Sequence, residues 1–134
     1  MFDLGFKEDD IVKHDVIIDK AKCGCMGGIR YSKQNNIIIL FMKSKSRYDN
    51  SWEGDTLKYM GAGKGNQFIE RNGNIRIAES KKKDTDIFLF EWIDGVNCKY
   101  IGKMVLTGTP YYEKRKNEYG DIEQKLFFKL KKVK

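Results

Sequence analysis

The chain has its most apolar stretch at Ile37 to Phe41, where three isoleucines precede a leucine and a phenylalanine. Polar residues enclose this run, with Gln34-Asn35-Asn36 before it and Lys43 to Ser46 after it. A short apolar run rich in β-branched residues between polar segments is typical of a buried strand. Because Asn35-Asn36 suits a tight turn, we expect Ile29-Arg30-Tyr31 to pair with this strand as a hairpin.

Similar short runs recur along the rest of the chain and are separated by clusters of Gly, Asn and Asp. Asp94-Gly95 lies between two of these runs and is a second hairpin signal. With Pro110 as the one proline, this pattern favours a curved, mostly β sheet or barrel. The further strands that the pattern predicts are Thr56 to Met60, Ile75 to Ala78, Ile87 to Trp92, Tyr100 to Leu106 and Leu126 to Leu130.

Two segments depart from the strand pattern. Near the N-terminus, a short extended piece at Asp10 to Val12 precedes Asp15 to Ala21, which predicts a short helix with Asp15 at its N-cap position. Between Thr109 and Gln124 the chain is charged and aromatic without a clear period. We therefore expect a surface loop or an irregular edge there.

The length and composition indicate one folded domain. A chain of 134 residues with 40% hydrophobic residues, eight Phe and seven Tyr can bury a sizeable core, so we expect a single domain over residues 1–134. No apolar run approaches the roughly 20 residues that cross a bilayer, and the opening MFDLGFKEDD lacks the features of a secretion signal. The expectation is a soluble, cytoplasmic protein with no membrane contact.

Cysteine content and charge narrow the chemistry. Cys23, Cys25 and Cys98 make an odd count, and His14, the one histidine, does not complete a zinc site with them. We expect free thiols, no metal and no cofactor. Lys and Arg total 26 against 19 Asp and Glu, and the net charge of +7 favours a polyanionic partner.

Arg47 to Gln67 differs in composition from the strands around it, because 21 residues contain three aromatics, three acids and four glycines. Glycines at positions 61, 63 and 65 permit the close approach of a flat ligand or a phosphate. The segment is not a dinucleotide fingerprint, since no helical period follows it. It is not a P-loop either, because Gly63-Lys64 is followed by glycine instead of Ser or Thr.

The aromatic residues of this segment suit an extruded base. Such a base needs two flat faces in place of its lost stacking and polar atoms in place of its lost pairing. Tyr48 and Tyr59 are candidates for the two faces, and Asp49 is a candidate acceptor for the N4 amino group of a cytosine. Asp55 is the rival acid, and for Trp52 we expect support of the core.

The same segment resembles the base-holding part of SRA (SET- and RING-associated, or YDG) domains. Those domains carry a strand, a Tyr-x-x-Asp-like loop and a Tyr-Thr-Gly-x-Gly run. This chain has the matching residues Ile38-Ile39-Leu40, Tyr48-Asp49, and Tyr59-Met60-Gly61-Ala62-Gly63. The resemblance covers most of the chain from Gly27 onward.

A closer resemblance is to the SRA-like N-terminal domain that precedes the HNH nuclease domain of McrA-type modification-dependent restriction enzymes. The residues that carry it are Gly27-Gly28-Ile29-Arg30-Tyr31-Ser32 and the pattern Gly54-Asp55-x-Leu57-x-Tyr59-x-Gly61-x-Gly63. The chain departs from the family at Gly65-Asn66-Gln67, where relatives usually have Gly-Asp-Gln.

The resemblance implies a mostly β (α+β) fold, a curved sheet or partly open β-barrel of the PUA-like/SRA type with one or two short helices. It also implies an aromatic pocket that holds a flipped, modified cytosine, and we assign that pocket to Tyr48, Asp49, Trp52, Tyr59 and Gly61. The candidate contacts to the DNA backbone around the pocket are Arg30, Lys33, Lys43, Lys45, Arg47, Lys64 and Gln67.

The implied function is that of a reader of double-stranded DNA carrying 5-methylcytosine or 5-hydroxymethylcytosine in a modification-dependent restriction system. The implied setting is the nucleoid, with a nuclease domain in the same or another chain as partner. Cutting requires a separate HNH domain with several His and Asn residues, so a chain with one His is not expected to be an enzyme. Two alternatives are an RNA-binding or ASCH-type small enzyme of the PUA-like group, and a scaffold that binds a protein.

Overall fold

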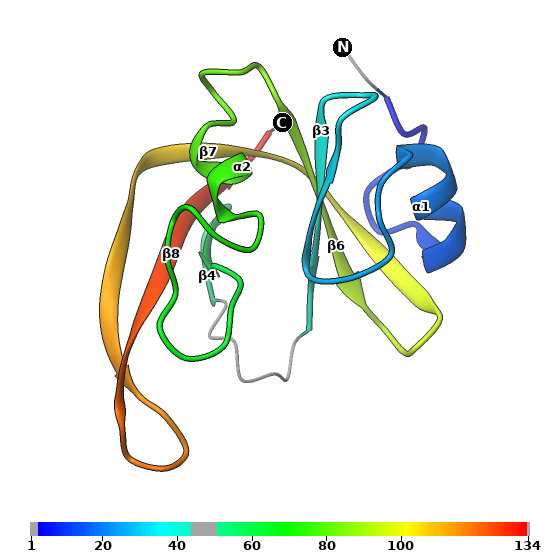
Figure 1. Ribbon diagram of the computed structural model, residues 1–134. Coiled ribbons are helices and arrows are strands. Elements are labelled where there is room, and N and C mark those ends of the chain that lie inside the picture. The colour runs from blue at the N-terminus through cyan, green and yellow to red at the C-terminus, as the bar shows by residue number, and fades with distance from the viewer. Residues whose placement is uncertain (1–2, 44–50, 134) are drawn as a thin grey trace.

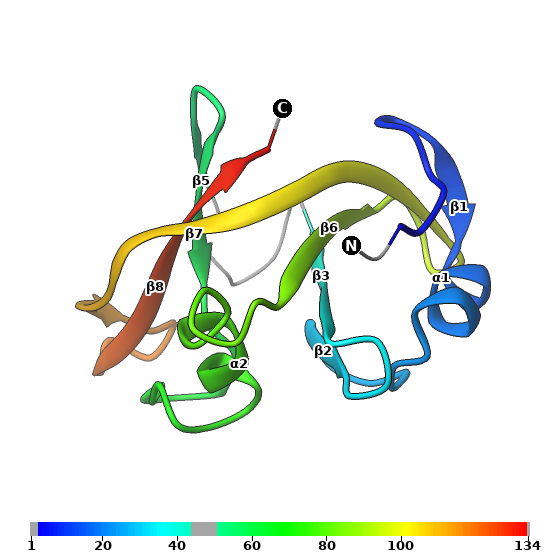
Figure 2. The same ribbon diagram turned by 90° about the horizontal axis from the view of Figure 1, so that it is seen from above.

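The computed structural model describes residues 3–43 and 51–133. Within these ranges the chain forms a curved sheet that carries two short helices (Figures 1 and 2). The expected mostly β (α+β) fold is confirmed. The elements in chain order are β1 (Ile11–Lys13), α1 (His14–Ala21), β2 (Ile29–Ser32), β3 (Ile37–Met42), β4 (Ser51–Glu53), β5 (Thr56–Met60), α2 (Asn74–Ala78), β6 (Asp86–Trp92), β7 (Asn97–Lys116) and β8 (Ile122–Lys132).

The strands form one sheet in the order β2-β3-β6-β7-β8-β5-β4, with β1 paired to β7. Strand β3 lies inside this sheet, antiparallel to β2 and parallel to β6. The hairpin expected between β2 and β3 is confirmed, and its turn contains Asn36 with φ 51°. The hairpin at Asp94-Gly95 is also confirmed, because β6 and β7 pair antiparallel on either side of it.

All six residues of β3 are buried because both faces of the sheet are covered. Side chains alternate between the two faces of a strand. Ile38 and Leu40 belong to the core cluster that includes Ile77 of α2, here called the α2 side of the sheet. Ile37 and Ile39 belong to the cluster that includes Ile17 of α1, here called the α1 side. Neither helix of the described residues is long and apolar enough to cross a membrane.

Strand β7 joins the two halves of the sheet. Its first residues pair with β1 and β6, and its later residues pair with β8. The register shifts near Gly102, which has φ 147°, and again between Thr107 and Tyr111 around Gly108, which has φ 67°. Irregularities of this kind bend a strand. Figure 2 shows the resulting curve of β7 across the whole molecule.

Three sequence expectations about local structure are wrong. Ile75 to Ala78 belongs to helix α2, and its Ile77 side chain packs into the α2-side core, so tertiary packing overrides β propensity there. Asp15 does not cap helix α1, because the helix already begins at His14 and its N-cap residue is Lys13.

The third error concerns the segment from Thr109 to Gln124, which is not a loop. Most of it is strand, since β7 continues to Lys116 and β8 begins at Ile122. The two strands form a long hairpin, called the β7–β8 arm below, that projects beyond the rest of the sheet in Figure 1.

Candidate nucleic-acid interface

Tyr59 lies on β5 opposite Phe128 of β8, with its side chain on the α2 side. The residue is 4% exposed. Its hydroxyl group donates a hydrogen bond to the carbonyl oxygen of Phe41 at 3.2 Å and also lies 3.5 Å from that of Gly28. These contacts connect β5 to the end of β3 and to the segment before β2, so the position of the phenol ring is fixed by the backbone of other elements.

Trp52 lies on strand β4, which pairs with β5 and ends the sheet. It stands opposite Leu57 and is 41% exposed. The expectation that Trp52 supports the core is therefore wrong, because an edge strand leaves one side of this ring uncovered. Tyr48 and Asp49, the other two side chains expected around the base, lie outside the described residues.

The chain directly after β5 forms a loop over residues 61–65, and a buried amide holds its start. Asn74 is 0% exposed. Its Oδ1 accepts a hydrogen bond from the Ala62 amide at 2.8 Å, and its Nδ2 donates to the carbonyls of Ala62 and Phe68. A Cβ on Gly61 would lie 2.8 Å from Asn74 Oδ1. Glycine is required at this position because any side chain would displace the amide that holds the loop.

A second buried amide, that of Gln67, attaches the same loop to β8. Its Nε2 donates to the carbonyls of Gly61 at 2.8 Å and Gly63 at 3.1 Å. Its Oε1 accepts a hydrogen bond from the Leu126 amide at 2.9 Å. Gln67 is 1% exposed, and its polar atoms are occupied inside the protein. The expected contact of Gln67 with the DNA backbone is therefore corrected to a role in fixing the loop.

The expected contact of Arg30 with the DNA backbone is also wrong, because its side chain is buried on the α1 side of the sheet. Its Nε donates to the Gly27 carbonyl at 2.8 Å, and a terminal nitrogen is hydrogen bonded to His14 Nε2. The guanidinium carbon lies 4.3 Å from the centroid of the Phe41 ring. Burial lowers the pKa of Arg30. Since arginine only donates, His14 Nε2 accepts, and this arrangement stabilises the N-terminal helix instead of a phosphate.

The other lysines and arginines that we expected to contact the DNA backbone do not all lie near Tyr59. Lys33, Lys43 and Lys64 are exposed, as a phosphate contact requires. Lys43 follows β3 at the end where Phe41 meets the Tyr59 hydroxyl, and Lys64 lies in the 61–65 loop. Lys33 follows β2 at the opposite end of β3. Lys45 and Arg47 lie outside the described residues.

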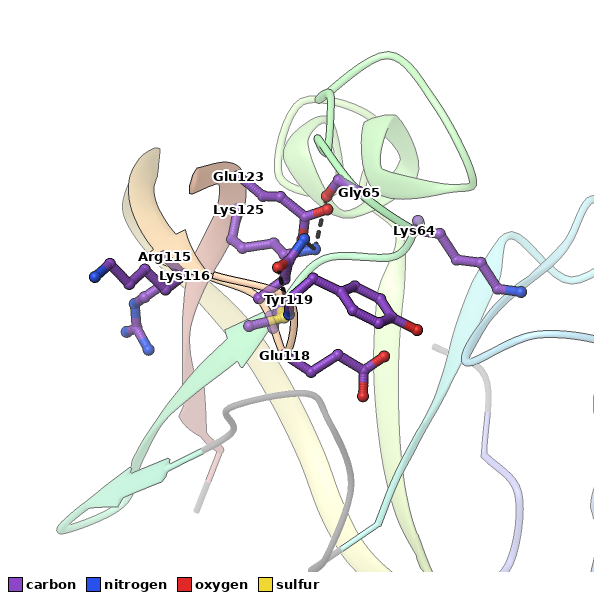
Figure 3. Close-up of a pocket in the computed structure, with 11 residues that line it drawn as sticks. Lys64, Gly65, Arg115, Lys116, Glu118, Tyr119, Glu123 and Lys125 are labelled. Atoms are coloured by element: carbon purple, nitrogen blue, oxygen red, sulfur yellow. Dashed lines mark hydrogen bonds and ion pairs between the residues drawn. The ribbon is translucent and has the colours of Figure 1, made fainter. Parts of the chain in front are cut away.

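The structure adds a cavity that the sequence did not predict, between the 61–65 loop and the β7–β8 arm (Figure 3). Its volume is about 460 Å³. The arm is attached to the loop by Lys125, whose Nζ donates to the Gly65 carbonyl at 2.6 Å and lies 3.3 Å from Glu123. The residues that line it include Met60, Gly63, Lys64, Arg115, Tyr119 and Lys125.

The sheet next to this cavity carries cations over aromatic rings on the α1 side of β5, β7 and β8. Phe127 is buried there beneath Lys58 Nζ at 4.4 Å and the Arg115 guanidinium at 5.0 Å. Glu113 accepts hydrogen bonds from Lys58 at 2.8 Å and Arg115 at 2.7 Å. The Lys58 bond and then the Arg115 bond hold the pKa of Glu113 below its ordinary value. One carboxylate is thus shared by two cations.

The sequence signal for this arm is an alternation of partly buried and exposed side chains. Tyr111, Glu113 and Arg115 are partly buried, and Tyr112, Lys114 and Lys116 are exposed. Because the partly buried residues are themselves charged or polar, a hydrophobicity pattern does not show this alternation.

Solved structures with the same fold include SRA domains. The TM-score is 0.72 to the sulfur binding domain and SRA domain of ScoMcrA complexed with phosphorothioated DNA, at 18% identity over 95% of this chain and 40% of that chain. It is 0.69 to the SUVH5 SRA complex with hemi-methylated CG DNA, at 19% identity over 96% of this chain and 89% of that chain. KRYPTONITE in complex with mCHG DNA and SAH also gives 0.69, at 14% identity over 97% of this chain and 32% of that chain.

The chain thus spans less than half of the ScoMcrA and KRYPTONITE chains it matches. None of the curated protein sequences compared with it matches significantly. The family model for the ScoMcrA-like SRA domain matches residues 10–134, a range that contains β2 to β8, both helices, Tyr59 and the 61–65 loop. The family resemblance expected from the sequence is confirmed, and the chain belongs to the ScoMcrA-like SRA domain family.

Proposed function

We propose that this domain binds double-stranded DNA that contains a modified cytosine and holds the modified base, turned out of the duplex, against the ring of Tyr59. The observation that carries the proposal is the fixed position of Tyr59 directly before a glycine loop in a member of an SRA family. An extruded base loses its stacking, and an aromatic ring that is already held in place replaces it with little further ordering. Because the Tyr59 ring is 4% exposed in the free domain, the proposal requires its face to be uncovered as the base enters.

The surroundings of Tyr59 support this reading. The 61–65 loop is held by the buried amides of Asn74 and Gln67, so backbone groups next to the ring have one defined arrangement. Preorganised polar groups bind better than mobile ones because little freedom is lost on binding. In the proposal, Tyr48 supplies the second ring and Asp49 the acceptor for the cytosine N4 amino group. Trp52, exposed on the edge strand β4, borders the same site.

Exposed cations supply the phosphate contacts in this proposal. Lys43 and Lys64 remain from the described part of the chain, and Lys45 and Arg47 complete the set. Lys33 is excluded from it, since it lies at the far end of β3. Phosphate contacts position a protein on DNA and do not discriminate between bases. The choice of base therefore rests on the pocket.

The domain acts in this proposal as a reader that does not cut. Its one histidine, His14, is occupied by Arg30 and stacks on Trp92 with ring centroids 5.0 Å apart. That environment is an aromatic core cluster, not a site for metal-dependent hydrolysis. Cleavage would come from an HNH-type nuclease domain in the same or another chain, within a modification-dependent restriction system that operates at the nucleoid.

The test is a binding panel measured by fluorescence anisotropy at one salt concentration. Four duplexes of the same sequence carry cytosine, 5-methylcytosine, 5-hydroxymethylcytosine or glucosylated cytosine, and a fifth carries an unmodified base with a phosphorothioate backbone. We expect the methylated or hydroxymethylated duplex to bind more tightly than the unmodified one. Equal affinity for the unmodified duplex and the three duplexes with a modified base would refute the proposal. Tighter binding of the phosphorothioate duplex alone would show that the domain recognises the backbone and not the base.

A further inference from the structure

The cavity between the 61–65 loop and the β7–β8 arm lies apart from the Tyr59 ring. Met60 lines the cavity, while its neighbour Tyr59 points into the α2-side core. Because successive side chains of a strand face opposite sides of a sheet, the two sites lie on opposite faces of β5. The cavity is therefore not the pocket proposed for the modified base.

Tyr119 at the tip of the β7–β8 arm is 82% exposed and lines this cavity. The tip has a defined shape: Asn117 Oδ1 accepts hydrogen bonds from the amides of Tyr119 at 2.9 Å and Asp121 at 3.0 Å. Gly120 adopts φ 84° in the same turn. An almost fully exposed tyrosine on a well-defined turn presents both ring faces to solvent, and such a ring suits stacking by a planar ligand.

The arm and the loop form one unit, so the cavity has stable walls. Asn66 Oδ1 accepts a hydrogen bond from the Gln124 amide at 2.8 Å, and the Gln67 amide donates to the Gln124 carbonyl at 2.8 Å. Lys125 adds its hydrogen bond to the Gly65 carbonyl. A volume of about 460 Å³ falls within the range of pockets for small organic ligands, roughly 300 to 1,000 Å³.

The charges around the cavity indicate which planar ligand it fits. Figure 3 shows the Tyr119 ring, the Glu118 carboxylate and the Lys64 side chain extending the same way from the cavity wall. Within residues 3–43 and 51–133, Lys64 forms no ion pair with an acidic side chain. The Glu118 carboxylate disfavours a phosphate on its part of the wall, and the Lys64 ammonium group favours one on the opposite part of the lining. A nucleotide combines a neutral base, which the ring can stack, with a phosphate, which the lysine can hold.

We propose that this cavity is a second nucleotide site, which stacks the base of an unpaired DNA nucleotide on Tyr119 and holds its phosphate with Lys64. The site requires neither a modified base nor a duplex, so it extends beyond the proposed function. The two sites share Lys64, and Tyr119 belongs to this site alone. Its ligand is single-stranded DNA, such as a gap, an overhang or a strand opened next to the duplex.

The experiment measures binding of an unmodified single strand of about ten nucleotides, within the length that small single-strand sites cover. We expect Tyr119→Ala to weaken binding about tenfold, the loss typical of one base–aromatic stack, and Tyr119→Phe to bind as the wild type does. A strand carrying 2-aminopurine should lose fluorescence on binding to the wild type and to the Phe variant, and much less with the Ala variant. Lys64→Gln should reduce the slope of log affinity against log salt by about 0.7, the value for one phosphate contact on a single strand.

Ile122→Ala is the matched control, because Ile122 is exposed on the same arm and does not line the cavity. Tyr119 contributes little to the core, so thermal unfolding should be the same for all variants. Unchanged affinity of Tyr119→Ala for the single strand would overturn the proposal, as would equal loss in the Phe and Ala variants. The ratio of affinities for modified and unmodified duplexes should stay at the wild-type value in Tyr119→Ala. If that ratio falls to one, Tyr119 belongs to the site that binds the modified base, and there is no separate second site.

Discussion

Asn74 Oδ1 lies 2.8 Å from the point that a Cβ on Gly61 would occupy. The contact joins the end of β5 to the first residue of α2, and it brings the 61–65 loop against a helix that is 13 residues further along the chain at Asn74. The same side chain bonds both polar backbone groups of Ala62. The shape of the loop beside Tyr59 is therefore determined by α2 as much as by its own glycines.

Gly61→Ala should lower the free energy of unfolding by about 1–3 kcal/mol, the usual cost of forcing an extra methyl group into a packed site. The displaced Asn74 amide should also weaken binding of modified DNA, because the loop beside Tyr59 loses its support. Urea denaturation and the duplex panel measure the two effects. Gly24→Ala is the control, since a Cβ there meets no atom within 4 Å. Equal stability of the two variants would contradict the role given to Asn74.

Gln67→Ala separates a structural role from a DNA contact. Removing the side chain leaves the Leu126 amide and two loop carbonyls without their partner, and each buried unsatisfied group costs about 1–3 kcal/mol. We expect a clear loss of stability in urea denaturation, because the side chain is buried. A normal unfolding curve together with weaker binding of modified and unmodified duplexes alike would instead restore the phosphate contact that the sequence suggested.

Tyr59→Phe removes the hydroxyl group that bonds to the Phe41 carbonyl and keeps the ring. The expected loss of stability is about 0.5–1.5 kcal/mol, and discrimination between modified and unmodified duplexes should persist. Tyr59→Leu keeps much of the apolar volume but removes the flat face, and it should reduce binding of the modified duplex by about 1–3 kcal/mol. If the leucine variant still discriminates as the wild type does, the base is not stacked on this residue.

Lys64→Ala should weaken modified and unmodified duplexes alike and should reduce the slope of log affinity against log salt by about 1. A phosphate contact carries no base information, so the affinity ratio between the two duplexes should not change. Lys33→Ala is the matched control because Lys33 is equally a solvent-exposed lysine but lies at the far end of β3. A larger effect at Lys33 than at Lys64 would place the duplex on another part of the surface.

The sequence predicted those parts of the molecule whose pattern is local. The buried strand at β3 and its hairpin with β2 follow from a β-branched run and an Asn-Asn turn, and both are confirmed. The sequence pattern predicts a strand at Ile75 to Ala78, because four residues are too few to show a helical period. What makes them a helix is distant in the sequence, namely the bonds of Asn74 to Ala62 and the place of Ile77 in the core.

The residues of the candidate site also differ in how far the sequence predicts their positions. Tyr59 and Gly61 belong to a motif with fixed spacing, so the sequence identified them together. Arg30 and Gln67 also lie in segments compared with the family, but their expected phosphate contacts rest on side-chain type alone. Neither charge nor polarity tells on which side of a sheet a residue lies. The same limit hid Tyr119, whose exposure depends on a strand pairing between residues far from any apolar run.

Glu113→Gln should destabilise the domain at neutral pH and have a smaller effect in acid. The hydrogen bonds from Lys58 and Arg115 hold the pKa of Glu113 below its ordinary value, so the folded state favours the ionised carboxylate. A depressed pKa contributes stability above the unfolded-state pKa and loses it as pH falls through the folded-state pKa. Solvent screening keeps the effect small, since Glu113 is about one-third exposed. The difference in unfolding free energy between wild type and Glu113→Gln should therefore shrink below the ordinary pKa of glutamate. Urea denaturation at a series of acidic pH values measures this difference, and Glu118→Gln on the same arm is the control. If the difference between wild type and Glu113→Gln stays constant with pH, the charge of the carboxylate does not hold Lys58 and Arg115 over Phe127.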